Sequence, residues 1–418
     1  MIRRIYTLLL YLLLPLVLLR LLWRSVKAPG YRRRWLERLG IFSPPANWGG
    51  LWIHAVSVGE VQAVVPLIRQ LLEDNPELAI TVTTTTPTGS ARVTEQLGEQ
   101  VFHVYFPYDL PLALTGFIRR VRPRVLLMVE TEVWPNLLHL CRRHGVYTLL
   151  ANARLSEKSA RRYARLGSFT RQTFSYIGRI AAQADADAMR FRELGVAAEN
   201  VTVTGSIKFD MRIPASLDEQ VEVLRRDWAG RPVWVAGSTH EGEDELVLFA
   251  HHKVLSRFPD ALLILVPRHP ERFDRVGGLC KRERLRMARR SRAGEYSHET
   301  QVYLGDTMGE LPLLLGSADV AFIGGSLIPT GGHNMLEASA QGVAVCFGPH
   351  VFNFAAISQL LIEEGGAVQV DNEAELATQV IAWFEEASVR AEVGENGRLV
   401  VEKNRGAMQR LIDLIPLP

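Results

Sequence analysis

The chain has 418 residues, of which 47% are apolar and 22% are charged. This composition is typical of a folded globular protein and excludes a largely disordered chain. A length beyond that of one ordinary hydrophobic core predicts two domains. The cysteines Cys141, Cys280 and Cys346 are scattered, which argues against a disulfide framework or a C-x-x-C zinc site and fits a reducing, cytosolic setting.

The net charge of +3 is unevenly distributed along the chain. Residues 1–40 contain nine arginines or lysines and one acid, a net charge of +8, so the remaining chain has −5. A general nucleic-acid-binding protein would have its positive charge on the folded domain, so we exclude nucleic acid as a partner. A basic N-terminal segment on a mildly acidic body predicts attraction to an anionic membrane surface.

Residues 5–19 are almost wholly apolar, and the apolar run continues past Arg20 to Trp23. Its length is marginal for a membrane-spanning helix. A cleaved signal peptide is the alternative, but no small-x-small cleavage site follows. We therefore expect an uncleaved signal-anchor or interfacial helix over residues 1–28. More basic residues follow the run than precede it, so the positive-inside rule predicts that the folded domains are cytoplasmic.

The rest of the chain alternates short β-rich runs with amphipathic stretches. Strands are expected at 51–56, 79–86, 101–106, 125–130, 147–152, 180–182 and 201–204, and helices at 112–120 and 137–144 and from the first strand to Leu72. After a break near 214–231, strands are expected at 233–236, 261–266, 302–304, 320–323, 343–347 and 367–370. This rhythm is typical of α/β domains with parallel sheets covered on both faces.

The predicted organisation has two doubly wound, Rossmann-like domains. They occupy 29–212 and 231–390, with a linker at 213–230. A C-terminal helix is expected over 391–418, and packing back on the first domain is one arrangement for it. Such folds bind ligands at the carboxyl ends of their strands, so we expect a cleft there.

The segment 54–60, HAVSVGE, ends the first strand and places Glu60 at the rim of that expected cleft. A carboxylate in this position can take a proton from a hydroxyl group as a general base. The same Ser57-x-x-Glu60 spacing is also a capping box, which pairs backbone donors at a helix start. The residues alone leave both interpretations open.

Two further segments of the first half place charged side chains after strands. In 129–136, VETEVWPN, Glu130 and Glu132 would be costly if buried and unpaired, so one of them is expected to face the cleft. Capping of the helix that begins near Pro135 is the alternative. In 204–210, TGSIKFD, Lys208 offers a compact ammonium group that can meet a carboxylate or a phosphate.

The second half has four strand-end loops rich in Gly, Ser, Thr, His or Arg. They are 237–243, 267–270, 305–311 and 324–337. Backbone donors at helix starts and an arginine fork suit phosphate, so the four loops together predict a nucleotide site. Ser238, Thr239 and Gly325 are possible donor-substrate contacts. Ordinary turn chemistry is the alternative.

Two other patterns are interpreted as structural. Asp185 and Asp187 resemble a metal-binding acidic pair but lie in an Ala-rich stretch, where capping or a solvated face is expected. The basic run 281–292 is interpreted as a solvated helix face, with contact to acidic lipid as the alternative.

Several strings, taken together and in order, resemble the bacterial 3-deoxy-D-manno-octulosonic acid (Kdo) transferase family. They are HAVSVGE, ETEVWPN, GSIKFD, GSTHEGE, PRHPERF, GDTMGEL and GGSLIPTGGHNMLEASAQG. The resemblance implies the two-domain GT-B fold. It also implies CMP-Kdo as donor, lipid IVA as acceptor and the inner leaflet of the inner membrane as the place of action.

The resemblance also assigns roles to residues. Glu60 would be the proton acceptor, and Glu130 and Lys208 would stabilise the transition state. The CMP contacts would fall on Arg268, His269, Gly309, Glu310, Leu311, Asn334, Met335, Leu336 and Glu337. Arg154 and Ser156 are possible acceptor contacts. No metal or other cofactor is expected, because a single leaving phosphate can be neutralised by cations and helix starts.

Two other functions remain open at this point. A nucleotide-sugar 2-epimerase shares the fold, but the hydrophobic N-terminus argues against it. A membrane-tethered nucleotide-binding scaffold without catalysis is the second alternative.

Overall fold

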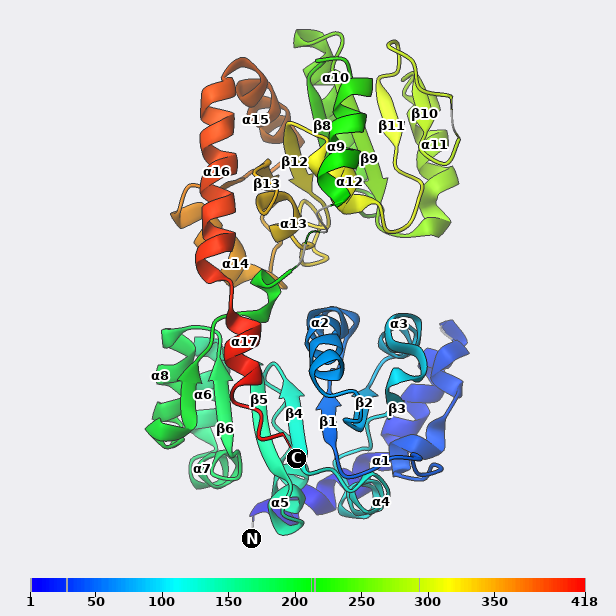
Figure 1. Cartoon of the computed structure of the whole chain (residues 1–418). Helices are drawn as coiled ribbons and strands as arrows, with labels where there is room; N and C mark the ends of the chain where they lie inside the picture. Colours follow the sequence, from blue (N-terminus) through cyan, green and yellow to red (C-terminus); the bar gives the residue numbers. More distant parts are fainter. Residues whose placement is uncertain (1, 28, 212, 214–215, 293, 418) are drawn as a thin grey trace. The chain divides into compact units, whose positions relative to one another are not determined.

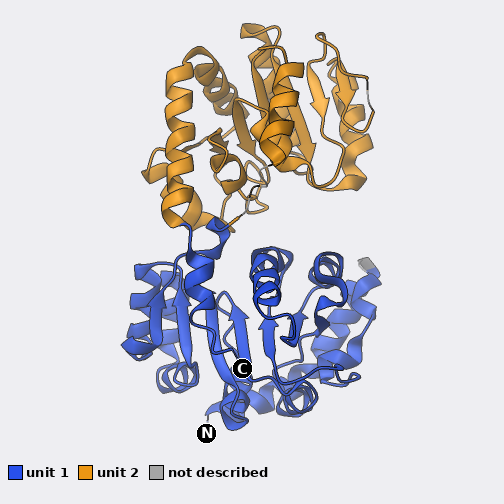
Figure 2. Ribbon diagram, viewed as in Figure 1, with its two compact units in different colours: residues 1–210, 405–418 blue, residues 211–404 orange. Residues whose placement is uncertain are grey.

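The computed structural model describes residues 2–27, 29–211, 213, 216–292 and 294–417. The chain forms two compact units. Unit 1 comprises Met1–Asp210 and Arg405–Pro418, and unit 2 comprises Met211–Asn404 (Figure 2).

Unit 1 is built on a seven-stranded parallel sheet with strand order β3-β2-β1-β4-β5-β6-β7 (Figure 1). Its strands are β1 (Leu51–His54), β2 (Ile80–Thr84), β3 (Phe102–Tyr105), β4 (Val125–Val129), β5 (Tyr147–Ala153), β6 (Arg179–Ala182) and β7 (Val201–Val203). The predicted strands are all present. Because all of them run in one direction, their carboxyl ends meet at one edge.

Helices cover both faces of this sheet, as the apolar strands require. One core contains side chains of α2 (Val58–Asp74), α3 (Pro87–Leu97) and α17 (Ala407–Ile412). The other contains side chains of α4 (Pro111–Val121), α5 (Pro135–Arg143), α7 (Ser168–Phe174) and α8 (Asp185–Glu193). The central strand β4 is buried along its whole length, so both cores depend on it.

The N-terminal helix α1 (Ile2–Lys27) is long and apolar enough to cross a membrane by length and composition, properties that signal sequences share. Tyr6 donates from its hydroxyl to Asp109 Oδ2 at 2.9 Å, and Arg3 Nη1 donates to Asn136 Oδ1 at 3.0 Å. Most of the apolar side chains of α1 remain exposed. The N-terminal end of α1 is therefore fixed to unit 1, while its apolar surface is uncovered.

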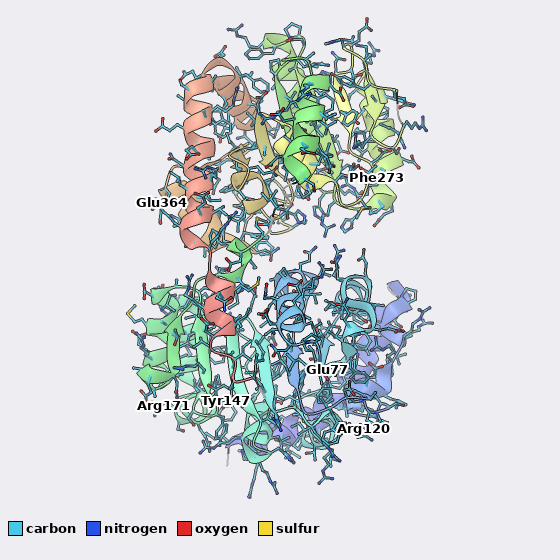
Figure 3. All side chains as sticks on the ribbon, in the orientation of Figure 1. Glu77, Arg120, Tyr147, Arg171, Phe273 and Glu364 are labelled. Carbon is cyan, nitrogen blue, oxygen red and sulfur yellow. The ribbon has the colours of Figure 1, made fainter. Side chains whose placement is uncertain are left out.

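The segment after α1 fastens the chain to unit 1. It forms the 3-10 turns η1 (Pro29–Arg32) and η2 (Trp35–Leu39). Arg38 Nη2 donates to the carbonyl of Thr85 at 2.9 Å, and Tyr105 N donates to Glu37 Oε2 at 2.8 Å. Arg120, at the end of α4 and labelled in Figure 3, donates from Nε to the carbonyl of Phe42 at 3.1 Å.

Unit 2 has a second seven-stranded parallel sheet, with strand order β10-β11-β9-β8-β12-β13-β14. Its strands are β8 (Val233–Thr239), β9 (Leu262–Pro267), β10 (Met287–Arg289), β11 (Val302–Leu304), β12 (Val320–Ile323), β13 (Ala344–Phe347) and β14 (Ala367–Gln369). Its helices are α9 (Ser216–Asp227), α10 (Asp244–Arg257), α11 (Phe273–Arg282), α12 (Leu311–Gly316), α13 (Leu336–Ser339), α14 (Ala355–Glu363), α15 (Glu373–Glu385) and α16 (Ala387–Asn404).

We expected the run 281–292 to be a helix face, but most of it is not helical. Helix α11 ends at Arg282, and edge strand β10 follows. Some of its arginines form ion pairs: Arg290 contacts Glu310 at 2.7 Å and Arg292 contacts Glu295 at 3.0 Å. The sequence indicates this strand only weakly, because it has only three residues and basic side chains stand on both sides of it.

Two of the expected segment boundaries also differ from the structure. The segment 213–230, expected as a linker, contains α9, and Arg225 of this helix donates to the carbonyl of Gly316 at 3.1 Å within unit 2. The expected single helix over 391–418 is two helices. Helix α16 belongs to unit 2, and α17 belongs to unit 1.

A carboxylate in the GSIKFD segment holds α17 on unit 1. The two oxygens of Asp210 accept from Gly406 N and Met408 N, each at 2.5 Å. Arg410 Nε donates to the carbonyl of Thr204 at 2.8 Å. An acid at a helix start pairs backbone donors that have no partner within the helix. The chain end therefore completes one face of the first sheet.

Candidate active site

Glu60 lies in the first turn of α2, just after β1. Its Oε2 accepts from Val56 N at 2.7 Å, and its Oε1 accepts from the Ser57 hydroxyl at 2.9 Å. Ser57 is the N-cap of α2 and accepts from Glu60 N at 3.4 Å. The capping interpretation of Ser57 and Glu60 is therefore confirmed, and it fixes the position of the carboxyl group.

The surroundings of Glu60 favour its neutral form. The residue is 9% exposed. Burial, and then the negative charges of Glu130 and Glu132, raise its pKa from 4.5 to about 7, against the opposing hydrogen bonds from Val56 and Ser57. A carboxyl group with a pKa near neutral pH can both accept and return a proton, which is what general acid–base chemistry requires.

Glu130 follows β4 directly and adopts a left-handed backbone conformation, with φ of 59°. This conformation is uncommon for a residue other than glycine and marks a strained turn. Its Oε1 lies 3.3 Å from Lys208 Nζ. Glu132 accepts from Trp134 Nε1 at 2.9 Å.

Neither Glu130 nor Glu132 caps the helix that begins at Pro135, so that alternative is wrong. Asp109 does so instead. Its carboxylate accepts from Asn136 N at 3.1 Å and from Leu137 N at 2.8 Å. The two glutamates after β4 are therefore available for other interactions, and one of them has a cationic partner.

Lys208 reaches Glu130 from the far end of the sheet. It lies in the 3-10 turn η5 (Ile207–Phe209), whose N-cap Ser206 accepts from Lys208 N. Asn152, at the end of β5, accepts from Ile207 N through Oδ1 at 3.2 Å. This hydrogen bond ties η5 to the carboxyl edge of the sheet. The edge thereby holds Glu130, Lys208 and Glu60, the last of which responds to the charge of Glu130.

The possible acceptor contacts lie in the next loop of the same edge. The carbonyl of Arg154 accepts from the Thr131 hydroxyl, so this loop adjoins the loop of Glu130. Ser156 is the N-cap of α6 (Glu157–Arg165) and accepts from Ser159 N at 3.2 Å. Leu155 N donates to Asp187 Oδ1 at 2.8 Å. Asp187 therefore has a structural role, as a buried link to the loop of Leu155, and is not on a solvated face.

In unit 2, Arg268 and His269 follow β9 directly. Arg268 N donates to the carbonyl of Thr239 at 2.9 Å. Next to them, His240 and His333 bring their Nε2 atoms within 2.7 Å, and their rings stack at 5.0 Å. Burial and neighbouring cations, including Arg268, lower the pKa of His240 to about 4 and that of His333 to about 3. The motif strings contained these two histidines, but only the structure shows that they are adjacent.

The last predicted CMP contacts gather near Arg268. Asn334 Nδ2 donates to Glu337 Oε1 at 3.2 Å, and Asn334 Oδ1 accepts from Leu336 N at 3.2 Å. Burial raises the pKa of Glu337, while the bond from Asn334 and the charge of Arg268 oppose that shift. Met335 and Leu336 are buried at the start of α13.

The loop Gly309-Glu310-Leu311 begins α12. Glu310 is its N-cap residue, and Gly309 has a φ of 84°, a conformation that favours glycine. The Glu310 carboxylate contacts Arg290 Nη2 at 2.7 Å and accepts from the Thr307 hydroxyl. Its side chain is therefore engaged within unit 2.

The possible donor contacts Thr239 and Gly325 already have partners for their polar groups. The Thr239 hydroxyl donates to Asp244 at 2.7 Å, and Gly325 N donates to Glu243 Oε2 at 2.6 Å. Ser238, next to Thr239 at the end of β8, has a left-handed backbone conformation with φ of 61°. The backbone N–H of Gly325 is thus satisfied within the protein, and the donor contacts of Ser238, Thr239 and Gly325 stay a prediction.

Glu243 is the carboxylate that accepts the hydrogen bonds of these loop N–H groups. Its side chain is fully buried and accepts from four backbone N–H groups, those of Gly325, Ser326, Leu327 and His240, at 2.6, 3.0, 3.0 and 3.2 Å. This carboxylate joins the loop after β8 to the loop after β12. It thereby fixes the positions of His240 and Gly325.

Within the described residues, no group of three or more His, Cys, Asp or Glu side chains is arranged to hold a metal ion. This includes Asp185 and Asp187, since Asp187 is bonded to Leu155 N and pairs with Arg190 at 3.6 Å.

Replacing Glu243 with alanine should lower the free energy of unfolding of unit 2 by about 3 kcal/mol or more, because each unpaired buried polar group costs about 1–3 kcal/mol. Hydrogen exchange of β8 and β12 peptides during a urea titration of the full chain measures this. Glu241→Ala is the matched control, since Glu241 pairs with Arg275 on the surface. Equal exchange in the two variants would contradict the prediction.

Comparison with known proteins shows the family to which the chain belongs. The model of the family described as 3-Deoxy-D-manno-octulosonic-acid transferase (kdotransferase) matches residues 33–211. A 3-deoxy-D-manno-octulosonic acid transferase of Haemophilus influenzae is 44% identical over 419 residues, covering 99% of this chain and 98% of the relative. One of Bordetella pertussis is 36% identical over 432 residues, covering 99% and 98%.

Solved structures with low identity confirm the fold alone. The UDP-GlcNAc 2-epimerase of Neisseria meningitidis, solved with UDP-GlcNAc, has a TM-score of 0.57 and 12% identity, covering 87% of this chain and 98% of that one. With two seven-stranded parallel sheets, the fold is GT-B. The full-length relatives and the family model together show that the chain is a glycosyltransferase of the 3-deoxy-D-manno-octulosonic acid (Kdo) transferase family.

Proposed function

We propose that this enzyme transfers Kdo from CMP-Kdo to lipid IVA, with inversion at the anomeric carbon, in lipopolysaccharide inner-core biosynthesis. The Kdo transferase relatives support the transfer of this sugar. The observation that supports the mechanism best is Glu60, a buried carboxyl group whose pKa is raised to about 7 beside Glu130. Such perturbed groups at strand ends are typical of catalytic sites.

In the proposed step Glu60 removes the proton from an acceptor hydroxyl group. The oxygen then forms a bond to the anomeric carbon of Kdo on one face. The bond from that carbon to the CMP phosphate breaks on the opposite face, and its electron pair leaves with CMP. The configuration inverts in a single displacement, and the proton remains on Glu60 until solvent removes it.

Lys208 and Glu130 are proposed to stabilise the transition state. Their contact at 3.3 Å holds an ammonium group at the edge that contains Glu60. A positive charge there can offset negative charge that develops on the reacting groups, and a fixed charge costs no reorganisation during the step. In this proposal the Glu130 carboxylate, at a strained turn after β4, holds the Lys208 ammonium group in place.

Unit 2 is proposed to bind CMP-Kdo. Arg268 and His269, the loop of Gly309, Glu310 and Leu311, and the helix start at Asn334–Glu337 supply a guanidinium, backbone donors and a carboxylate for ribose hydroxyls. An arginine fork suits a phosphate. The leaving group has one phosphate, so these groups can neutralise it, and we propose that no divalent metal takes part.

The enzyme is proposed to act at the cytoplasmic face of the inner membrane. Helix α1 has an apolar surface that unit 1 leaves uncovered, and basic residues lie at both of its ends. Lipid tails can cover such a surface, and anionic head groups attract the arginines.

Glu60→Gln should lower the rate of Kdo transfer by about 10²–10⁴-fold, since a general base contributes that much. Transfer of radiolabelled Kdo from CMP-Kdo to lipid IVA measures it. Ser57→Ala is the control for the cap: it removes the N-cap hydroxyl but keeps the carboxylate and its bond from Val56 N, so its loss should be much smaller. Unchanged transfer by Glu60→Gln would remove the general-base role of Glu60. Absence of transfer by the unmodified enzyme would end the proposal and favour an epimerase or a scaffold.

The value of kcat/KM for lipid IVA should rise with pH and level off, with a midpoint near the Glu60 pKa of about 7, because only the ionised carboxylate can accept a proton. Initial rates across a pH series test this. Since the charge of Glu132 helps to raise that pKa, Glu132→Gln should move the midpoint to lower pH. A rate that falls across this range would contradict the assignment.

Kdo transfer should persist in excess EDTA, because cations of the protein neutralise the leaving phosphate. The measurement is the initial rate with EDTA compared with the rate with added Mg²⁺. Loss of transfer in EDTA that Mg²⁺ or Mn²⁺ restores would show that a metal ion has this role instead.

A further inference from the structure

Helix α6 has an unusual concentration of positive charge. Its sequence EKSARRYAR contains Lys158, Arg161, Arg162 and Arg165 against one acid, Glu157. Its nine residues are all described, and none is buried. The proposed transfer step assigns no role to these cations.

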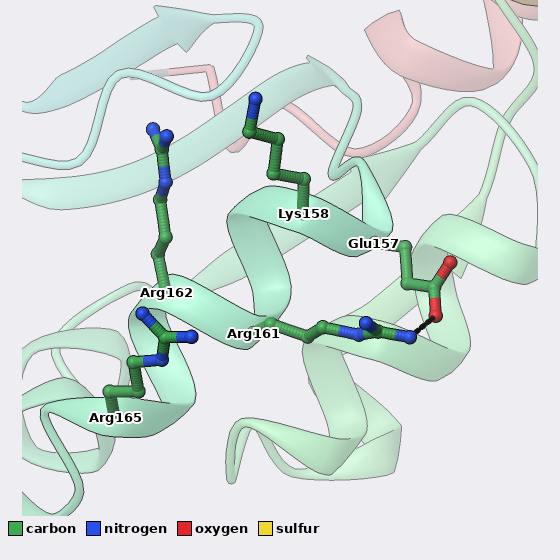
Figure 4. A pocket seen from close by; sticks show the side chains of 5 residues that line it. All are labelled: Glu157, Lys158, Arg161, Arg162 and Arg165. Atoms are coloured by element: carbon green, nitrogen blue, oxygen red, sulfur yellow. Dashed lines mark hydrogen bonds and ion pairs between the residues drawn. The ribbon is translucent and has the colours of Figure 1, made fainter.

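Three of these cations share one side of the helix. Lys158, Arg162 and Arg165 are spaced four and three residues apart, which places them on one face. Arg161 pairs with Glu157, and Figure 4 shows this contact, while Lys158 and Arg162 extend together in another direction. Among the described residues, no carboxylate pairs with Lys158, Arg162 or Arg165. With Glu157 and Arg161 they line a hollow of about 380 Å³.

The basic face of α6, defined as Lys158, Arg162 and Arg165, adjoins the proposed catalytic edge. The loop before α6 contacts the loop of Glu130, since the Thr131 hydroxyl donates to the carbonyl of Arg154. Burial, and then the negative charge of Glu132, raise the pKa of Tyr163 in the middle of α6. The helix therefore lies beside the carboxylates that follow β4.

The other end of α6 approaches the apolar helix α1. Tyr6 of α1 packs on Phe169, just beyond α6, with ring centroids 6.2 Å apart. Leu166 lies between α6 and Phe169 and is 55% exposed. An anionic group bound by α6 would thus have an apolar surface at one end and the catalytic edge along its side. A lipid with a charged head group has this combination of properties.

We propose that the basic face of α6 binds the phosphate groups of the acceptor lipid and holds its sugar hydroxyl group at the catalytic edge. This inference rests on the proposed function, because it takes a phosphorylated glycolipid as the acceptor. Guanidinium groups bind phosphate through two parallel hydrogen bonds, and a neighbouring ammonium adds a point charge. The donor phosphate has its own candidate cation in unit 2, Arg268, so α6 serves the acceptor.

The test compares two double variants of the full-length enzyme in detergent micelles. Arg162→Ala/Arg165→Ala removes two guanidinium groups from the basic face. Arg119→Ala/Arg124→Ala is the matched control, because it removes two exposed arginines at the amino edge of the same sheet. The first variant should raise KM for lipid IVA at least about tenfold, since each charged hydrogen bond contributes that order. Its kcat and its KM for CMP-Kdo should stay unchanged, and the control should change none of the three.

A second arm separates acceptor phosphates from other anions. With lipid IVA that has been dephosphorylated, the basic-face variant and the unmodified enzyme should have the same KM. Sedimentation with phosphatidylcholine vesicles containing phosphatidylglycerol should be equal for the two proteins, and inorganic phosphate should compete only weakly.

The inference would be overturned by an unchanged KM for lipid IVA, by the same loss with the dephosphorylated lipid, or by a loss that follows vesicle binding. The last result would assign α6 to the membrane surface. Failure of the unmodified enzyme to transfer Kdo would contradict the proposed function itself, so the two failures are distinguishable. Arg162→Lys/Arg165→Lys should recover part of the affinity, as a fold defect would not.

Discussion

The candidate active site in unit 1 depends on parallel strands that end at one edge of a sheet. Neighbouring strands β1 and β4 place Glu60 and Glu130 there directly. Lys208 follows β7, three strands away in the sheet, and the turn that contains it is tied to the end of β5 by a hydrogen bond to Asn152. The contact between Lys208 and Glu130 then fixes an ammonium group within the same cluster of carboxylates. A parallel sheet thus collects charges that are far apart in the sequence.

The protein satisfies many of its own loop donors with internal carboxylates. Asp109 pairs the first amide groups of α5, Asp210 those of α17, and Glu243 joins the loops after β8 and β12. Each of these acids makes its hydrogen bonds in or near a candidate substrate loop. Buried backbone donors without partners are costly, so loops fixed in this way hold their shape in the absence of a ligand. Preorganised loops are what electrostatic stabilisation of a leaving group needs.

The proposed membrane attachment and the proposed acceptor binding both involve unit 1. Asp109 accepts from Tyr6 of α1 and from the amide groups of α5, so the apolar helix is tied to the segment that follows Glu130 and Glu132. The ring of the same Tyr6 also packs on Phe169, just beyond α6. A lipid substrate would then meet apolar, basic and acidic surfaces in order, and the proposed chemistry needs them in that order: tails, phosphates, hydroxyl group.

The sequence by itself determined the α/β class, two parallel sheets, nearly every strand and the apolar N-terminal helix. These features follow from the spacing of apolar residues within short segments. It also indicated Glu60 and the strand-end loops, since such loops are local too. Only the tertiary structure decided which polar group meets which. Asp109 and not Glu130 caps α5, Glu243 occupies the amide groups of Gly325 and its neighbours, and His240 meets His333. These partners are 27 to 93 residues apart, and contacts over such separations follow from chain topology, which local sequence patterns do not specify.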